Sequence, residues 1–373
     1  MKCSINLRNS MGLGGISNYI KNISINLPNN GNHNFTGCAF WRKSLNKRDY
    51  NWFPGEICET LIPERFAYDP KITIPFAYET LMGMTVDYNV FFSYRLPNVN
   101  FKSPIVSTIH DIILLRTKTE PEIIIKEHLN ELQDTINKST YILTVSECSK
   151  KDLIEYFNID KNRIFIVHNG IDYDYMNKRL SKIELETIKR KYRLPDNYIL
   201  NFGIYRKHKN LERLIEAYAL LPKDIRKNLK LVFTCNHPSL DILIEHFGLR
   251  EDVLNIGFIP DSEKPAIFQL SQMVYYASIY EGFGVPVLEA QAAGTPVITS
   301  NISALPEAAG DGALFVNPYD IYAIRDAIQL LYLDRGLSNQ IVTDGRKNAS
   351  QYTWQKSAEE FISFLDQISV HDR

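Results

Sequence analysis

The amino-acid sequence predicts an α/β protein built from two doubly wound domains. Short apolar strands alternate with helical segments in both halves of the chain, which is the pattern of sheets covered by helices. The chain has 373 residues, enough for two domains of ordinary size. Its 45% of hydrophobic and 23% of charged residues are the proportions of a soluble globular protein.

Charge and cysteine usage argue against several function classes. The formal net charge of −1 gives no electrostatic reason to expect a nucleic-acid partner. The 5 cysteines are scattered and form no C-x-x-C pair, so we expect reduced thiols rather than disulfides or a zinc site. The first residues lack the apolar core of a signal peptide, and no apolar run reaches the about 20 residues of a membrane span. These features predict a cytoplasmic protein.

The first strand is expected at residues 3–7 and leads into a glycine-rich loop. Gly12, Gly14 and Gly15 lie in this loop, and apolar residues then recur at helical spacing from 16 to 27. A strand, a glycine loop and a helix in this order begin a nucleotide-binding α/β unit. Ser17 stands where a dinucleotide fingerprint has its third glycine, so the loop is not that fingerprint. A simple tight turn is the alternative interpretation.

A second strand is expected at residues 33–40, and a stretch rich in basic and aromatic residues follows it. Residues 41–60 contain Arg42, Lys43, Lys47 and Arg48 among tryptophan, tyrosine and phenylalanine residues. The stretch fits a solvated loop whose aromatic residues enter the core. It also fits a surface that touches lipid headgroups or a lipid-linked acceptor.

A continuous apolar strand is expected at residues 105–109, as in a parallel sheet buried on both faces. It ends in His110 and Asp111, and ligands of open α/β sheets bind at the carboxyl ends of strands. His110 is therefore a candidate functional residue, whereas Asp111 either orients its ring or caps the next helix. Further strands are expected at 88–93, 141–145 and 164–167, helices at 123–136 and after Ser146, and a charged helical connection at 173–193.

In the second half, a strand at residues 198–202 is followed by a basic loop. Arg206, Lys207 and Lys209 lie between this strand and the next helix. Cations fixed at such a place can neutralise the negative charge that develops on a departing diphosphate. Lys209 and Arg206 are the candidates for this role, and Lys207 is interpreted as a solvated side chain.

Residues 276–300 carry the most specific pattern. A polar loop from Glu281 to Gly284 runs into Pro286, which suits the first turn of a helix, and Gly294 ends that helix before another buried strand. The free N–H groups of the first turn form an anion site. Glu281 and Glu289, eight positions apart, suit the hydroxyl groups of a sugar and a ribose. A nucleotide sugar meets both needs; a capped helix with two solvated glutamates is the alternative.

These segments resemble glycosyltransferase family 4, whose members are retaining enzymes with the GT-B fold. The resemblance is most specific at residues 276–300, the E-x7-E signature, and then at 203–211 and 105–111. It implies two Rossmann-like domains facing across a cleft. The expected bounds are 1–175 for the acceptor-side domain, 190–352 for the nucleotide-sugar domain, and 353–373 for a helix that crosses back to the first domain.

The resemblance also implies transfer of a hexose, with mannose from GDP-mannose as the leading donor, in surface polysaccharide synthesis. The acceptor would be a glycan or a lipid-linked saccharide, and peripheral contact with the inner membrane face is a further expectation. No metal or other cofactor is expected. The implied catalytic residues are His110 and Glu281, and the implied donor-binding residues are Gly14, Gly15, Arg206, Lys209, Phe283, Gly284, Val285 and Glu289.

Several alternatives stay open at this point. UDP-glucose, UDP-galactose or dTDP-rhamnose could replace GDP-mannose as the donor. A GT-B-like nucleotide-sugar epimerase would turn over the donor without an acceptor. A non-enzymatic sensor or scaffold would bind the donor without transfer or hydrolysis.

Overall fold

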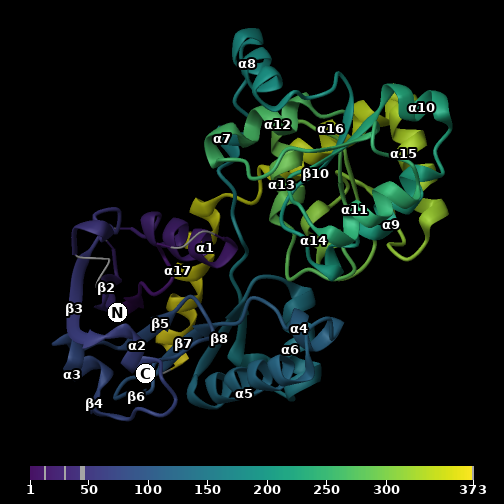
Figure 1. Ribbon diagram of the computed structural model, residues 1–373. Coiled ribbons are helices and arrows are strands. Elements are labelled where there is room, and N and C mark those ends of the chain that lie inside the picture. Colours follow the sequence, from purple (N-terminus) through teal and green to yellow (C-terminus); the bar gives the residue numbers. More distant parts are fainter. Residues whose placement is uncertain (12–13, 29–30, 43–46, 372–373) are drawn as a thin grey trace. The chain divides into compact units, whose positions relative to one another are not determined.

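The computed structural model describes residues 1–371 except 12–13, 29–30 and 43–46. The chain divides into two compact units (Figure 1). Unit 1 comprises Met1–Gly170 together with Trp354–Arg373, and unit 2 comprises Ile171–Thr353. Residues 171–175, which the sequence analysis assigned to the first domain, thus fall in unit 2.

Unit 1 is built on a parallel sheet that has seven strands within the described residues. Its strand order is β3-β2-β1-β5-β7-β8-β9, so the chain winds outward from β1 in both directions, as in doubly wound folds. Two short strands form a separate pair. The strands are β1 (Lys2–Asn6), β2 (Asn34–Trp41), β3 (Glu56–Pro63), β5 (Tyr88–Phe91), β7 (Ile105–Thr108), β8 (Tyr141–Thr144) and β9 (Ile164–Ile166), with β4 (Ile74–Ala77) and β6 (Val99–Asn100) as the pair.

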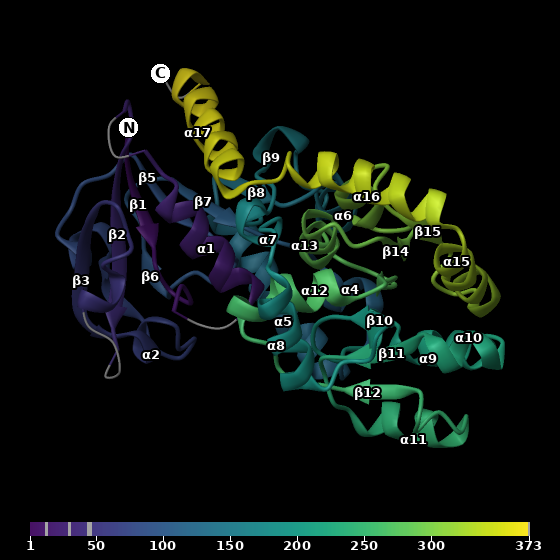
Figure 2. The same ribbon diagram turned by 90° about the horizontal axis from the view of Figure 1, so that it is seen from above.

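Helices cover both faces of this sheet (Figure 2). The helix that follows the glycine loop packs beside the C-terminal helix of the chain. His168 fixes that C-terminal helix, because its backbone N–H and its Nδ1 contact the Glu360 carboxylate at 2.8 and 2.9 Å. The helices of unit 1 are α1 (Gly15–Ile25), α2 (Glu64–Ala67), α3 (Tyr78–Met82), α4 (Ile113–Thr117), α5 (Glu122–Lys138), α6 (Glu147–Phe157) and α17 (Trp354–His371), with 3-10 turns η1 (Lys47–Tyr50) and η2 (Lys161–Arg163).

Unit 2 contains a second parallel sheet, with six strands in the part of the chain that the structure describes. Its order is β12-β11-β10-β13-β14-β15, and all four residues of β10, β13 and β14 are buried. Burial of every residue in these strands is expected for a sheet that is covered on both faces. The strands are β10 (Tyr198–Asn201), β11 (Lys230–Phe233), β12 (Val253–Asn255), β13 (Met273–Tyr276), β14 (Val297–Ser300) and β15 (Leu314–Val316).

Residues 173–193, which we expected to connect the domains, are part of unit 2. Their two helices pack against other helices of the same unit, α7 against α13 and α8 against α12. The helices of unit 2 are α7 (Tyr173–Met176), α8 (Lys182–Tyr192), α9 (Leu211–Ala219), α10 (Lys223–Asn228), α11 (Pro238–His246), α12 (Lys264–Leu270), α13 (Val285–Ala293), α14 (Leu305–Ala309), α15 (Ile321–Leu333) and α16 (Arg335–Ala349), with η3 (Lys207–Lys209) and η4 (Asp261–Glu263).

The basic and aromatic stretch at 41–60 is only partly the loop we considered. Tyr50 and Phe53 enter the core, with 4% and 5% of their surface exposed, as that interpretation requires. The stretch also contains η1 and the start of β3, a strand at the edge of the sheet. Lys43 lies outside the described residues, as do the side chains of Lys47 and Arg48.

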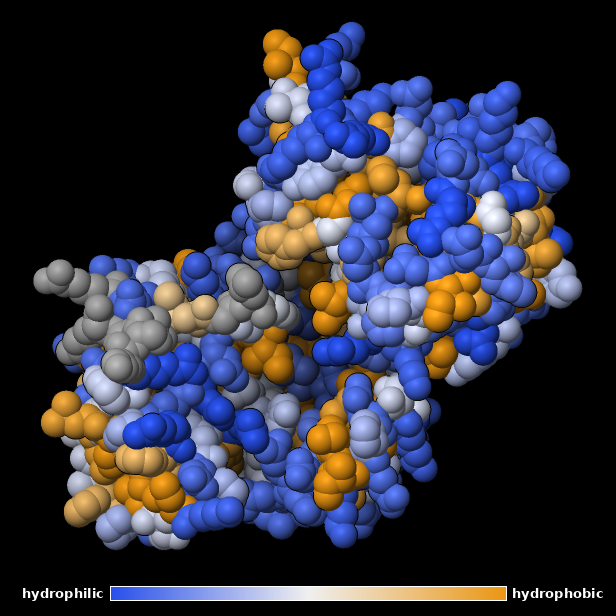
Figure 3. Space-filling view, viewed as in Figure 1, coloured by the Kyte–Doolittle hydropathy of each residue, from blue (hydrophilic) through white to orange (hydrophobic). Residues whose placement is uncertain are grey.

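Two observations describe the apolar character of the surface and of the helices. On the visible face of unit 2, hydrophilic side chains predominate and the apolar ones form small separate patches (Figure 3). Among the described residues, no helix combines the length and the apolar character that crossing a membrane requires.

Candidate active site

The first part of the candidate site is the amino-terminal end of α13 in unit 2. Gly284 is the N-cap residue, with φ at 137°, and Pro286 lies in the first turn, where its missing N–H costs nothing. Gly294 ends the helix in the left-handed conformation, with φ at 77°, as the sequence predicts. No side chain caps the first turn, so its N–H groups and the positive end of the helix dipole can receive an anion.

Lys209 and Glu281 form an ion pair beside this helix. Lys209 Nζ lies 2.6 Å from Glu281 Oε1 and also donates to the Tyr276 hydroxyl. Only 18% of the Lys209 side chain and 12% of the Glu281 side chain are exposed. Burial disfavours the charged forms, but the mutual attraction outweighs it, so the pKa of Lys209 is raised and that of Glu281 is lowered. Both groups are therefore charged at neutral pH.

Two loops are joined by hydrogen bonds that hold this pair in place. Asn210 is buried in the left-handed conformation, and its amide donates to the carbonyls of Ala277 and Pro318 at 3.2 and 2.7 Å. The N–H of Ile279 donates to the carbonyl of His208 at 2.7 Å. The loop after β10 is thereby fixed to the loop after β13. Lys209 and Glu281, 72 positions apart, meet because β10 and β13 are neighbours in the sheet.

Glu289, the second glutamate of the motif, has a cationic partner that the sequence analysis missed. Lys264 Nζ of α12 lies 3.1 Å from Glu289 Oε1 and 2.9 Å from Asp261 Oδ1. Burial raises the pKa of Glu289, and the nearby Lys264 only partly offsets this effect. Tyr276 was missed as well. Its place at the carboxyl end of β13 was the signal that could have indicated it.

Arg206, Phe283 and Val285 are the other residues of unit 2 that the sequence predicts for the donor site. Arg206 is exposed, and its guanidinium makes no hydrogen bond or ion pair within the described part of the chain; only its carbonyl contacts Lys209, accepting the backbone N–H at 2.9 Å. Phe283 is 3% exposed and packs edge-on against Tyr352, with ring centroids 5.4 Å apart. Val285 is the first residue of α13.

In unit 1, His110 lies at the carboxyl end of β7, as the sequence predicts. Its Nε2 is 3.3 Å from the Phe92 carbonyl. A carbonyl only accepts, so Nε2 carries the proton and Nδ1 is left as an acceptor. The Tyr19 ring of α1 meets the imidazole edge-on at 4.7 Å, and the Tyr19 hydroxyl donates to the Val167 carbonyl at 3.0 Å. Asp111 accepts the N–H of Ile113 at 2.9 Å, a local side-chain contact just before α4, whose N-cap residue is Ile112.

The glycine loop lies directly before α1 in the sequence of unit 1. Gly14 is the N-cap residue of α1 with φ at 136°, and a side chain added at Gly14 or Gly15 would meet no atom within 4 Å. Gly12 lies outside the described residues.

Burial makes His110 a determinant of acid stability. It lowers the pKa of His110 from 6.5 to about 4. The unfolded chain then binds a proton more readily, so the stability contributed by neutral His110 is present above pH 6.5 and is lost as pH falls toward 4. We expect His110→Gln to remove about 2 kcal/mol of the stability difference between pH 7 and pH 5. Urea unfolding at both pH values measures it, with His246→Gln, an exposed position, as the control. An unchanged difference would contradict the burial argument.

Comparison with known proteins identifies the family. The family model described as Glycosyltransferase Family 4 matches residues 13–175, and that described as Glycosyl transferases group 1 matches residues 184–348. The O-antigen chain mannosyltransferase B of Escherichia coli is 31% identical over 265 residues, which cover 69% of each chain. The chain belongs to glycosyltransferase family 4. As a member of this family, the protein is a hexosyltransferase. The resemblance to glycosyltransferase family 4 that the sequence showed is confirmed.

Two further matches differ in how much of the other protein this chain covers. The serotype-specific mannosyltransferase WbdA of Escherichia coli is 28% identical over 237 residues, covering 62% of this chain but only 29% of WbdA. A solved structure of Anabaena Alr3699/HepE in complex with UDP and glucose shares the fold, with a TM-score of 0.71, 16% identity, and coverage of 98% of this glycosyltransferase and 100% of that chain. The expected α/β, GT-B fold class is confirmed.

Proposed function

We propose that this glycosyltransferase transfers mannose from GDP-mannose to a glycan or lipid-linked saccharide in surface polysaccharide synthesis. The observation that carries the proposal is the buried Lys209–Glu281 pair beside the uncapped first turn of α13. The names of two relatives, an O-antigen chain mannosyltransferase and a serotype-specific mannosyltransferase, support the sugar and the pathway class.

In the proposed reaction, the donor diphosphate binds at the first turn of α13 and beside Lys209. The bond between the sugar C1 and the β-phosphate oxygen breaks, and its electron pair stays on the phosphate, where Lys209 and the helix N–H groups stabilise the charge. The acceptor hydroxyl oxygen bonds to C1 on the same face, and its proton passes to the leaving phosphate. Retention follows from this same-face attack.

The two glutamates and His110 have positioning roles in this proposal. Glu281 is ionised because of Lys209, so it can accept hydrogen bonds from sugar hydroxyls. Glu289 takes the ribose hydroxyls, exchanging contacts with Lys264. Nδ1 of His110 accepts a hydrogen bond from a hydroxyl of the sugar or the acceptor. Arg206 supplements the charge at the diphosphate.

A panel of nucleoside diphosphates tests the donor. GDP is expected to raise the melting temperature of the wild type in proportion to the logarithm of its concentration, and UDP and dTDP to raise it less. Larger shifts with UDP or dTDP would overturn the GDP assignment in favour of the other donors. Consumption of GDP-mannose without acceptor would favour an epimerase or hydrolase, and binding without any turnover would favour a sensor.

We also propose that catalysis needs no metal ion. Lys209 and the first turn of α13 supply the positive charge that a metal provides elsewhere. Turnover should therefore survive dialysis against EDTA, and a loss restored by Mg²⁺ or Mn²⁺ would refute this point.

Peripheral membrane contact belongs to the same proposal, because a lipid-linked acceptor is presented at a membrane surface. Co-sedimentation with liposomes of anionic lipid tests it, and protein that stays in the supernatant would contradict it.

A further inference from the structure

Three neighbouring strands of unit 1 each place a charged residue at their carboxyl ends. Arg8 follows β1, Arg42 follows β2 directly, and Glu64 follows β3 directly. The register of β2 and β3 shifts between Phe40 and Trp41, so that Trp41 pairs with Pro63. The next residues of the two parallel strands, Arg42 and Glu64, are thereby brought side by side.

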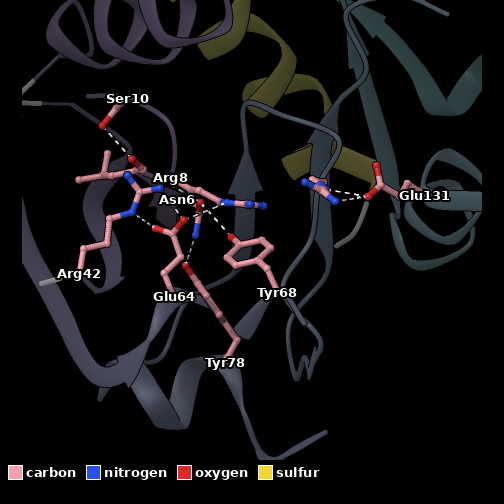
Figure 4. A network of polar contacts seen from close by, with 10 residues as sticks. Asn6, Arg8, Ser10, Arg42, Glu64, Tyr68, Tyr78 and Glu131 are labelled. Atoms are coloured by element: carbon pink, nitrogen blue, oxygen red, sulfur yellow. Dashed lines mark hydrogen bonds and ion pairs between the residues drawn. The ribbon is translucent and has the colours of Figure 1, made fainter. Parts of the chain in front are cut away.

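One carboxylate serves both arginines (Figure 4). Arg42 Nε and Nη2 donate to the two oxygens of Glu64, each at 2.5 Å, and Arg8 Nε donates to Glu64 Oε1 at 3.2 Å. Only 14% of the Arg8 side chain and 14% of the Glu64 side chain are exposed. Two guanidinium groups therefore share one negative charge, which leaves one positive charge in excess at this edge of the sheet.

Arg8 is held firmly, yet one of its side-chain nitrogens has no hydrogen-bond partner among the described residues. Its Cζ lies 3.6 Å from the centre of the Tyr68 ring, and its backbone N–H donates to the buried Asn6 at 3.1 Å. Within the described part of the chain, Nη1 of Arg8 is buried and has no hydrogen-bond partner. Leaving buried N–H groups without a partner is costly. A purely structural ion pair with Glu64 needs only Arg42.

Arg8 and Arg42 lie at the same edge of the sheet as His110, because β1, β2, β5 and β7 pair in parallel and these residues follow the carboxyl ends of β1, β2 and β7. The carboxyl edge of the sheet is also where ligands of open α/β sheets bind.

We propose that Arg8 and Arg42 bind a phosphate group carried by the acceptor, at the carboxyl ends of β1 and β2. This inference rests on the proposed function and deepens it, since it gives the acceptor an anionic group. The planar fork of a guanidinium matches phosphate oxygens, and Glu64 fixes both forks in orientation without neutralising both. The phosphate supplies the acceptor that Nη1 of Arg8 lacks.

Binding of inorganic phosphate tests the site directly. Calorimetry is done on protein saturated with the nucleoside diphosphate that gives the largest thermal shift, so that the anion site of α13 is already filled. Arg8→Gln is expected to weaken phosphate binding about tenfold, and Arg8→Lys to weaken it less, because it keeps the charge. Arg65→Gln removes an exposed cation directly after Glu64 and is the matched control.

Steady-state kinetics show whether the enzyme recognises the phosphate of the acceptor or the group that carries this phosphate. With a phosphorylated saccharide acceptor, Arg8→Gln should raise the KM for the acceptor about tenfold and leave the KM for the donor unchanged. With the same saccharide lacking phosphate, wild type and variant should agree. A water-soluble phosphosaccharide and a lipid-linked one in detergent should show equal effects, since the phosphate is common to both.

Three results would overturn the inference. One is an Arg8→Gln protein with the melting temperature of the wild type that also binds phosphate like the wild type. Another is an Arg8→Gln protein that loses only binding to anionic vesicles, which would assign the site to a membrane headgroup. The third is a wild type that binds the nucleoside diphosphate and transfers sugar but does not bind phosphate. Absence of donor binding altogether would instead refute the proposed function.

Discussion

Replacing Lys209 by alanine is expected to lower kcat about a thousandfold, the order of loss seen when one charge-stabilising group is removed from a transition state. Lys209 is the cation that the fold holds beside the first turn of α13, 2.6 Å from Glu281. Its removal takes away positive charge where the leaving phosphate becomes more negative. Single-turnover measurement of sugar transfer checks the expectation without interference from product release.

Loss of stability must be separated from loss of catalysis in this variant. Lys209→Ala leaves the Glu281 carboxylate buried without its cation, which costs about 3 to 5 kcal/mol when such a pair is broken. The double variant Lys209→Ala/Glu281→Ala removes both charges and should regain much of that stability while staying inactive. Lys207→Ala changes an exposed neighbour in the same turn and should remain active. Wild-type turnover in the folded double variant would refute the site.

Gly284→Val is expected to weaken binding of the nucleoside diphosphate at least tenfold and to lower the melting temperature. Gly284 has φ at 137°, which a β-branched residue adopts only under strain. A Cβ there would also lie 2.8 Å from Leu305 Cδ2 and 3.3 Å from Ala308 Cβ. The first turn of α13 would have to shift, and its N–H groups would no longer point at the same place. Thermal-shift titration with the diphosphate measures both effects.

Gly336→Ala provides the control for this change. Gly336 is an exposed residue near the start of α16, where alanine is a better helix former than glycine. It should therefore bind the diphosphate normally and be as stable as the wild type or slightly more so. If Gly284→Val bound the diphosphate as tightly as Gly336→Ala does, the anion site would not be the end of α13.

The features that the sequence predicted correctly are those with local causes. Pro286 and Gly294 mark the two ends of α13, and the structure places both as the sequence predicts, because helix initiation and termination depend on a few neighbouring residues. Ser146 caps α6 by accepting the N–H of Ser149 at 3.0 Å, again a local contact. The strand before His110 was predicted as buried, and all four of its residues are buried.

The sequence did not predict an edge strand with a weak apolar pattern, nor contacts between residues that lie far apart in the chain. β3 was not recognised because it is an edge strand whose residues are mostly half-exposed, so it lacks the apolar run of a central strand. The partners of the site residues lie far away in the chain: Lys264 is 25 positions from Glu289, and Glu64 is 56 positions from Arg8. No spacing rule connects such residues.

By itself, the sequence determined the class of the fold, the family, and the two ends of α13. Those properties follow from periodicity, caps and short motifs, each contained within a few turns of chain. Only the tertiary structure decided that Lys209 meets Glu281 and Tyr276, that Tyr19 packs on His110, and that Arg8 and Arg42 share Glu64. Sheet order and strand register, which no local pattern encodes, bring these side chains together.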